Sequence, residues 1–222
     1  MLFIIDFDGT LACADTVDAL LERFAAPAWQ DVEEEWLAGR ITAIECMTRQ
    51  MALIEADRIT LENYFRAIEL DPSFLQFYEH VVRFARVAIV SDGLDHAVRV
   101  AMREARLPAV PIFANQLVFR PNGVAIEFPH LNQQCSVGNG VCKCAVAREL
   151  AGPDGGPIVL VGDGKSDACL ADRADVVFAK GRLLDHCISR NIDHMPFKTF
   201  ADVLATVRNW PAMTPVRASA LA

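Results

Sequence analysis

Four short runs of apolar residues, each followed by glycine or polar residues, stand out in the hydrophobic pattern of the chain. They occupy residues 2–7, 87–90 and 158–161, with a weaker example at residues 175–178. Runs of this length that end in polar residues predict buried β-strands. Because the carboxyl ends of parallel strands lie along one edge of an α/β sheet, we expect the polar residues after these runs to gather there.

A long stretch of helical pattern separates the first two predicted strands. A simple crossover between parallel strands needs about a dozen residues, whereas residues 8–86 lie between these two. Asp71 and Pro72 are typical of an N-cap and first helical turn, and they predict a helix that continues to Val81. An inserted helical subdomain is therefore predicted. Its other apolar residues recur at the spacing of one helix face, at Val17, Leu20, Leu21 and Phe24, at Ile41, Ile44, Met47, Met51 and Ile54, and at Leu61, Tyr64, Phe65 and Ile68.

The rest of the chain alternates helices with short strands. Helices are predicted over residues 94–106, 143–150 and 199–210, and a hairpin over residues 117–119 and 124–128 around Pro121, Asn122 and Gly123. Residues 213–222 have little to hold them and are predicted to fray. The whole pattern predicts an α/β protein with a parallel-sheet core, formed by residues 1–13 and 85–222, and a helical cap formed by residues 14–84.

Composition and charge narrow the class of protein. Hydrophobic residues make up 53% of the 222 positions and charged residues 23%, as in a folded globular chain. The formal net charge is -8 without a run of lysine or arginine, which argues against nucleic acid or a membrane surface as partners. Asp6 and Asp8 interrupt the apolar start, unlike a secretory signal, and the seven cysteines fit thiols kept reduced. These features predict a cytoplasmic enzyme that acts on a small molecule.

Two pairs of aspartates follow predicted strands. Asp6 and Asp8 come directly after the first strand in the sequence DFDGT, and Asp163 and Asp167 follow the third apolar run in the sequence GDGKSD. Carboxylates so close resist joint ionisation unless a divalent cation or a shared proton compensates. Carboxylate oxygens are the ligands that Mg²⁺ prefers. Either motif alone is found in ordinary polar turns, but together they predict a magnesium site at the sheet edge.

A serine and a lysine lie where phosphate ligands are expected. Ser91 follows the second apolar run, so its hydroxyl and the backbone amides after it are placed to hold phosphate oxygens. Lys143 begins a predicted helix and would supply a cation for a phosphate dianion. Alone, a strand-end serine or a helical lysine is usually structural or solvated. In combination with the acidic motifs, the candidate phosphate-binding residues are Thr10, Ser91, Asp92 and Lys143.

In this order and spacing, these elements resemble the motifs of the haloacid dehalogenase superfamily of phosphatases, and the likeness extends over residues 6–167. The resemblance implies a Rossmann-like core with a cap inserted between the first and second motifs. It implies Asp6 as the nucleophile that becomes phosphorylated and Asp8 as the acid that protonates the leaving alcohol and later activates water. Ser91 and Lys143 would hold the phosphoryl group.

The same resemblance implies which residues hold the metal. Asp163, the carboxylate of Asp6 and the backbone carbonyl of Asp8 would ligate Mg²⁺, and Asp167 would support them. Mg²⁺ and the lysine would then neutralise the charge that spreads over the phosphoryl oxygens. A cap that closes would exclude water and contact the substrate, so selectivity is predicted to lie in residues 15–84.

Within the superfamily the chain is similar to the phosphoserine phosphatase branch, and most similar to the phosphatases that act on 2-hydroxy-3-keto-5-methylthiopentenyl-1-phosphate in methionine salvage. This likeness rests on the cysteine-bearing segment before Lys143 and on residues 162–196. Residues 135–144 space their cysteines more widely than those enzymes do. The resemblance implies a small phosphorylated metabolite as substrate, with phosphoserine or another small ester as the alternative.

Three other classes of protein share part of this pattern. A dehalogenase would use Asp6 without magnesium, but an acid at Asp8 serves an oxygen leaving group. A receiver-like signalling domain would accept phosphate on an aspartate, although the long helical insert fits it poorly. A phosphoryl-transferring mutase would interconvert sugar phosphates without net release of phosphate.

Several residues are weaker candidates. Asp15 follows the first motif, where it either contacts substrate or caps the next helix. Arg49 either pairs with a substrate carboxylate or phosphate, or lies on a solvated helix face. Cys135, Cys142 and Cys144 match no standard zinc pattern with a fourth ligand nearby, so they are predicted to be packing thiols.

Overall fold

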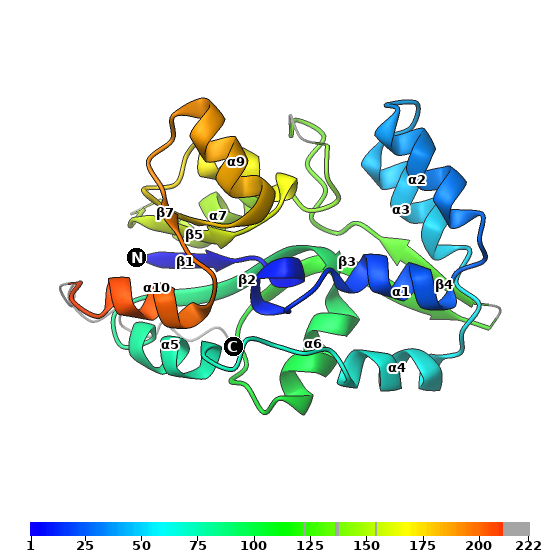
Figure 1. The fold of residues 1–222 in the computed structure, drawn as a ribbon, viewed down its shortest axis with the longest axis horizontal. Coiled ribbons are helices and arrows are strands. Elements are labelled where there is room, and N and C mark those ends of the chain that lie inside the picture. Colours follow the sequence, from blue (N-terminus) through cyan, green and yellow to red (C-terminus); the bar gives the residue numbers. More distant parts are fainter. Residues whose placement is uncertain (122, 136–137, 154, 211–222) are drawn as a thin grey trace.

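A seven-stranded sheet forms the centre of the molecule, in the strand order β4-β3-β2-β1-β5-β6-β7 (Figure 1). The computed structural model describes residues 1–121, 123–135, 138–153 and 155–210. Neighbouring strands pair in parallel except β3 and β4, which are antiparallel, so the predicted parallel sheet is confirmed. The strands are β1 (Leu2–Ile5), β2 (Arg86–Leu94), β3 (Ile112–Arg120), β4 (Gly123–Glu127), β5 (Ile158–Gly162), β6 (Val176–Ala179) and β7 (Met195–Pro196).

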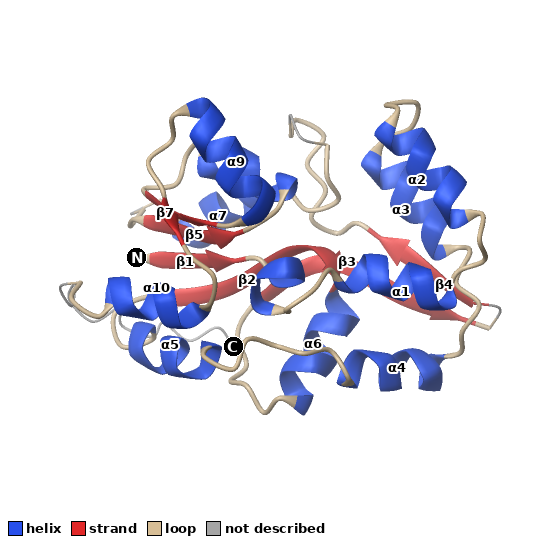
Figure 2. Ribbon diagram, in the orientation of Figure 1, coloured by secondary structure: helices blue, strands red, loops and turns tan. Residues whose placement is uncertain are grey.

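Helices cover both faces of the sheet and make up the insert between β1 and β2, which confirms the predicted helical insert (Figure 2). Helices α2, α8 and α9 and strand β7 are additional to the sequence prediction. The spacing of Trp29, Val32 and Trp36 marks α2, and that of Leu183 and Cys187 marks α9. The helices are α1 (Thr16–Phe24), α2 (Trp29–Leu37), α3 (Ala43–Met51), α4 (Arg58–Arg66), α5 (Phe74–Val81), α6 (Asp95–Glu104), α7 (Lys143–Ala151), α8 (Ala168–Ala171), α9 (Gly181–Arg190) and α10 (Phe200–Val207).

Side chains of β1 alternate between two buried helical layers. Leu2 and Ile4 pack with α7, α8 and α9 on one face of the sheet. Phe3 and Ile5 pack with α5, α6 and α10 on the other. Because both faces are buried, this strand is apolar at every position rather than alternating. The end of β1 is therefore held between two packed layers.

A third apolar cluster joins the insert to the β3–β4 hairpin. Leu20 of α1, Met51 of α3 and Phe65 of α4 pack with Leu117 of β3 and Ile126 of β4. Strand β3 is longer than predicted, because its first residues pair in parallel with β2 before the remainder pairs with β4. The insert therefore rests on the hairpin, with α2 and α3 on the side of the molecule beyond the carboxyl end of β1 (Figure 1).

The start of α5 differs from the sequence prediction. The helix begins at Phe74 rather than Pro72, and Asp71 is not its N-cap. Asp71 is buried, and its Oδ1 accepts a hydrogen bond from Ser73 N at 2.8 Å while Oδ2 accepts one from Phe200 N at 2.7 Å. The carboxylate thus ties the turn before α5 to the first residue of α10, and both helices pack on the sheet.

The division of the chain into a core of residues 1–13 and 85–222 and a cap of residues 14–84 stays a prediction.

The helices predicted over residues 94–106, 143–150 and 199–210 are confirmed as α6, α7 and α10. Asn122 of the predicted turn and the predicted frayed end, residues 213–222, lie outside the described residues. Within the part of the chain that the structure describes, the helices lack the length and hydrophobicity that crossing a membrane requires.

Candidate active site

Strand β1 delivers Asp6 to the carboxyl edge of the sheet. The backbone N–H of Asp6 donates to the carbonyl oxygen of Val161 in β5 at 2.9 Å, so Asp6 continues the strand ladder. The chain then bends through an irregular helical turn at Phe7–Leu11. Within it, Gly9 has φ +66°, and a Cβ there would lie 2.5 Å from Oδ2 of Asp163. Glycine is therefore required for the two acidic motifs to approach each other.

A buried lysine links the two acidic motifs. Lys143, the first residue of α7, is fully buried, and its Nζ lies 2.7 Å from Oδ2 of Asp6 and 2.5 Å from Oδ1 of Asp167. Burial by itself lowers the pKa of the ammonium, but the charges of Asp167 and Asp6 outweigh it and raise the pKa above its usual value. The side chain therefore stays a cation in the interior.

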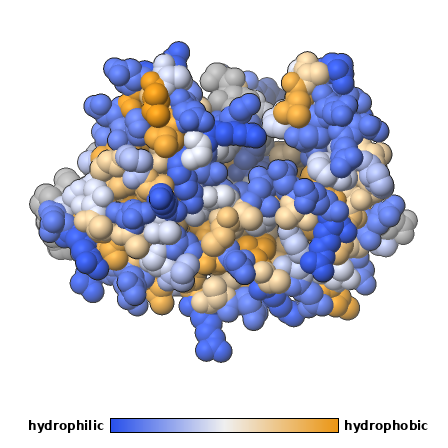
Figure 3. All heavy atoms as spheres, in the orientation of Figure 1, coloured by the Kyte–Doolittle hydropathy of each residue, from blue (hydrophilic) through white to orange (hydrophobic). Residues whose placement is uncertain are grey.

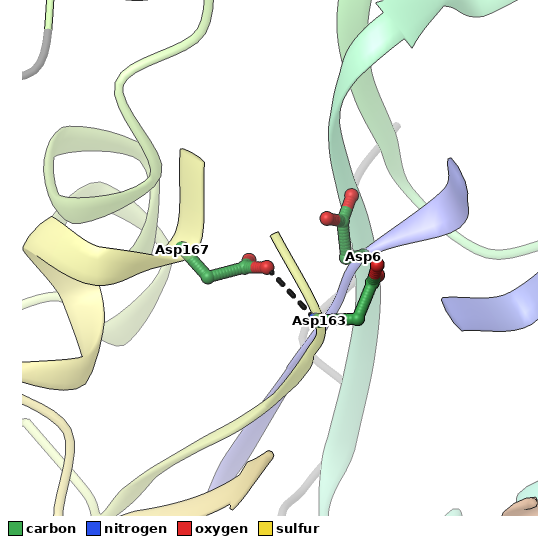
Figure 4. A group of neighbouring side chains, drawn as sticks. All are labelled: Asp6, Asp163 and Asp167. Carbon is green, nitrogen blue, oxygen red and sulfur yellow. Dashed lines mark hydrogen bonds between the residues drawn. The ribbon is translucent and has the colours of Figure 1, made fainter. Parts of the chain in front are cut away.

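Three carboxylates come close together at this edge of the sheet (Figure 4). Oxygen atoms of Asp6, Asp163 and Asp167 all lie within 4.8 Å of one another. Burial raises the pKa of Asp6 and of Asp163, and the charge of Asp167 adds to the increase in both. One ammonium against three carboxylates leaves two negative charges, which a hard divalent cation would balance. This donor set fits Mg²⁺.

Hydrogen bonds orient the acidic cluster. Oδ2 of Asp167 accepts from the backbone N–H groups of Asp163 at 3.1 Å and Gly164 at 3.0 Å. The hydroxyl of Thr10 donates to Oδ1 of Asp163 at 2.6 Å. Thr10, which the sequence analysis groups with the phosphate ligands, is thus buried with its hydroxyl committed to a carboxylate.

The second aspartate of the first motif, Asp8, is held by different partners. Its Oδ1 accepts hydrogen bonds from the backbone N–H of Thr16 at 2.9 Å and from the Thr16 hydroxyl, and its Oδ2 accepts one from Ser91 Oγ at 3.2 Å. Burial raises the pKa of Asp8 to about 6, and the charge of Asp15 adds to the increase. A carboxyl group with this pKa can hold and release a proton near neutral pH, as general acid–base catalysis requires.

Near its end, β2 places Ser91 and Asp92 beside the loop that precedes α7. The backbone N–H of Gly93 donates to Ser91 Oγ at 2.9 Å. Asp92 Oδ1 accepts from Val141 N at 3.0 Å, and Asn115 Nδ2 donates to the Asp92 carbonyl oxygen at 2.6 Å. Burial raises the pKa of Asp92 to about 6. Asn115 was not predicted from the sequence, where its signal is an amide that directly follows the apolar residues Ile112, Phe113 and Ala114 of β3.

The family model described as haloacid dehalogenase-like hydrolase matches residues 3–172, a span that includes the lysine and all the acidic residues of the site. The chain belongs to this family. The sequence resemblance is thereby confirmed for the family as a whole.

Similar proteins support the same assignment. The 2-hydroxy-3-keto-5-methylthiopentenyl-1-phosphate phosphatase of an Exiguobacterium species is 30% identical over 209 residues, which cover 92% of this chain and 96% of its own. The enzyme of that name from Geobacillus kaustophilus is 32% identical over 208 residues, covering 92% and 94%. This chain is therefore a phosphatase of the haloacid dehalogenase type, a hydrolase of phosphomonoesters.

Solved structures share the fold of this haloacid dehalogenase-like chain. A substrate-bound phosphoserine phosphatase complex matches with a TM-score of 0.69 and 22% identity, covering 92% of this chain and 96% of that one. A haloacid dehalogenase family hydrolase from Salmonella enterica matches with a TM-score of 0.71 and 18% identity, covering 95% and 72%. The parallel core with a helical insert is thus the fold of the family.

A cleft of about 500 Å³ lies between the sheet edge of this haloacid dehalogenase-like core and the insert. Asp6, Asp8, Ser91, Asp92 and Asp163 line it from the core. Residues of α1, α2 and α3 line it from the insert. The molecular surface is hollowed between the side that carries α9 and the side that carries α2 and α3 (Figure 3). The cleft therefore brings the insert against the acidic residues.

The two weaker candidates of the insert lie in different places. Asp15 lines the cleft and caps α1, since its Oδ1 accepts from Val17 N and Asp18 N, each at 3.0 Å. Arg49 donates two hydrogen bonds to Glu35, at 2.7 and 3.1 Å, and lies outside the set of residues that line the cleft. Arg49 is thus held by a neighbouring carboxylate of the insert.

The cysteines on either side of Lys143 have their own hydrogen-bond partners. The thiol of Cys142 is buried and accepts a hydrogen bond from Asn132 Nδ2 at 3.7 Å, and Cys144 Sγ donates to the carbonyl oxygen of Cys169 at 2.7 Å. All seven cysteines are free thiols. The fold adds Cys169 to the group, although it lies 25 positions after Cys144.

Proposed function

We propose that this chain hydrolyses a small phosphomonoester in two steps, with Asp6 as the nucleophile that becomes an aspartyl-phosphate. The observation that carries the proposal is the position of Asp6, which lines the cleft at the end of β1 with one carboxylate oxygen 2.7 Å from Lys143 Nζ. Contact with a buried cation favours the ionised carboxylate, the form that attacks phosphorus.

We assign the proton transfers to Asp8. In the first step an oxygen of Asp6 bonds to phosphorus, the bond from phosphorus to the leaving alcohol oxygen breaks, and Asp8 gives that oxygen its proton. In the second step Asp8 takes a proton from the water that attacks phosphorus, and the bond from phosphorus to Asp6 breaks to release inorganic phosphate. The pKa of about 6, which burial produces, supports both uses of the group.

The phosphoryl oxygens are held by Ser91 and Lys143 in this proposal. Both lie beside the reacting carboxylates, since Ser91 Oγ donates to Asp8 and Lys143 contacts Asp6. The side chains of Thr10 and Asp92 serve a positioning role in this proposal, because they bond to the acidic cluster and to the loop before α7.

The resident metal in the proposal is Mg²⁺, held by the carboxylates of Asp6 and Asp163 and the backbone carbonyl of Asp8, with Asp167 in support. When bound, Mg²⁺ would neutralise the negative charge that develops on the phosphoryl oxygens. The net charge of the acidic cluster and the hard oxygen donors support this choice of ion.

For the substrate we propose 2-hydroxy-3-keto-5-methylthiopentenyl-1-phosphate, a small metabolite of methionine salvage, and with it a cytoplasmic location. The support is the identity of 30% and 32% to curated enzymes named for that ester, over nearly the full length of both chains. Phosphoserine is the alternative, because a phosphoserine phosphatase shares the fold.

The test is phosphate release from the methylthiopentenyl phosphate, phosphoserine and p-nitrophenyl phosphate, with Mg²⁺ or with EDTA. We expect release that needs Mg²⁺ and that falls at least about 10³-fold in Asp6→Asn. The control is Asp172→Asn, which removes an exposed aspartate of the same domain. Incubation with substrate and rapid quenching should also leave phosphate on the peptide that contains Asp6. Undiminished release by Asp6→Asn, or release unaffected by the chelator, would contradict the proposal.

A further inference from the structure

The wall of the cleft that comes from the insert combines apolar and acidic side chains. Its large apolar side chains are Val17, Trp36 and Met47, and its acidic members are Asp15, Asp18 and Glu33. They face the core residues across the space in which a leaving group would lie. This wall therefore meets the part of the ester that distinguishes one substrate from another.

Glu33 is fixed in this wall by two residues of α3. Gln50 Nε2 donates to Glu33 Oε2 at 2.8 Å, and the thiol of Cys46 lies 3.8 Å from the same oxygen. Gln50 is 3% exposed and Cys46 is also 3% exposed, so both partners are set by the packing of α2 on α3. A carboxylate held in this way keeps its position when a ligand enters, and no large loss of side-chain entropy opposes its action.

Positive charge in the cleft lies on the opposite wall. Lys165 and Arg182, both from the core, are the basic residues among those that line it in the described part of the chain. Burial and the charges of Asp15 and Glu33 raise the pKa of Asp18 to about 6, although the charge of Arg182 lowers it in part. Arg49, the basic side chain of α3 itself, is occupied by Glu35. The insert wall is thus acidic without a lysine or arginine of its own.

We propose that Glu33 is a specificity-determining residue, which excludes leaving groups that carry a carboxylate and admits neutral ones whose apolar end packs on Val17, Trp36 and Met47. A substrate carboxylate at this wall would face negative charge in a partly desolvated cleft, where repulsion is stronger than in water. A thioether or alkyl chain would instead bury apolar surface on the aromatic and thioether side chains. This inference rests on the proposed function and adds the class of ester to it.

The test compares two synthetic esters of matched length, 3-(methylthio)propyl phosphate and 3-carboxypropyl phosphate, with p-nitrophenyl phosphate as a general substrate. They share the phosphate and the three-carbon linker, and differ in whether the far end is neutral or charged. For the wild-type enzyme with Mg²⁺, we expect kcat/KM to favour the thioether ester by about tenfold or more. Equal values for the two esters would overturn the proposal.

The decisive variant is Glu33→Gln, whose amide oxygen can still accept from Gln50. We expect it to raise kcat/KM for the carboxylate ester at least about threefold, with a smaller change for p-nitrophenyl phosphate, which carries no carboxylate. Glu34→Gln is the matched control, because Glu34 is an exposed neighbour in the same helix and is not part of the cleft lining. Asp18→Asn removes a second charge from the same wall. It should also reduce the ratio of kcat/KM for the thioether ester to kcat/KM for the carboxylate ester.

The outcomes separate this inference from the proposed function. Release from p-nitrophenyl phosphate with no preference between the two esters, or a preference that Glu33→Gln and Asp18→Asn leave unchanged, would overturn the role of Glu33 while the phosphatase mechanism stands. Failure to release phosphate from any ester would overturn the proposed function itself, and the specificity assignment with it. If Glu34→Gln reduced the preference for the thioether ester as much as Glu33→Gln does, the effect would be one of general charge, and a specific role for Glu33 would be rejected.

Discussion

The ammonium nitrogen of Lys143 lies 2.5 Å from Oδ1 of Asp167, and both side chains are fully buried. The lysine begins α7, whereas the aspartate ends the helical turn Lys165–Asp167 after β5. The same nitrogen is 2.7 Å from Asp6 at the end of β1. One buried cation therefore binds together three segments of the site, and it compensates charges that would otherwise repel one another.

Replacing this lysine should damage both catalysis and stability. In Lys143→Met the carboxylates of Asp6 and Asp167 lose their partner while they stay buried, and we expect the free energy of unfolding without Mg²⁺ to fall by about 3–5 kcal/mol. We expect kcat to fall by about 10²–10³-fold, because a cation beside the phosphoryl oxygens is lost. Thermal unfolding and phosphate release measure the two effects.

The matched control is Lys165→Met, which removes an exposed lysine that also lines the cleft. It should change stability by less than about 0.5 kcal/mol, since surface substitutions usually do. Similar losses of stability in the two variants would show that the ion pairs of Lys143 contribute little.

Gly93 should be needed for the position of Asp8. A Cβ built on Gly93 would collide with Oδ2 of Asp8, and it would also come within 3.1 Å of Ser91 Oγ. We expect Gly93→Ala to fold and to lose about 10²-fold in kcat, because a displacement of the reacting group by about 1 Å costs that much. Phosphate release at saturating substrate measures the loss.

The control for this substitution is Gly164→Ala, at a second glycine of the cleft. A Cβ on Gly164 would have its nearest contact at Ser166 Oγ, 3.6 Å away, which is an ordinary van der Waals distance. We therefore expect Gly164→Ala to lose much less activity than Gly93→Ala. Wild-type activity in Gly93→Ala would contradict the role given to Asp8.

The pH dependence of stability should carry a contribution from Asp92. Burial raises its pKa in the folded chain to about 6, above the ordinary value of 3.8. Between these values the folded state binds the proton that the unfolded state has already released, so stability falls as pH rises from about 4 to 6 and stays lower above that. The full difference corresponds to roughly 3 kcal/mol.

Asp92→Asn removes this titration and keeps an oxygen that can accept from Val141 N. We expect the difference in Tm between the variant and the wild-type chain to shift in favour of the variant as pH rises from 4 to 7. The other buried carboxylates titrate in both proteins and cancel in the comparison. A difference in Tm that is constant over this pH range would contradict the assignment.

The local pattern of hydrophobic residues predicted much of the fold. The apolar runs at β1, β2, β5 and β6 mark strands that are buried on both faces, and the helical spacing of the insert survives in α1, α3 and α4. The start of α5 was predicted wrongly, because Asp71 bonds to Phe200, which lies 129 positions later. Contacts over such distances leave no trace in the local pattern.

The sequence by itself determined the chemistry of the site, because acidic residues and a serine directly follow apolar runs that predict buried strands, and a lysine begins a predicted helix. The tertiary structure decided the partners. In the folded chain Thr10 donates a hydrogen bond to Asp163, Thr16 donates to Asp8, and Lys143 lies between the carboxylates of Asp6 and Asp167. The physical reason is that strand order and helix packing bring these atoms together, and periodicity along the chain encodes neither.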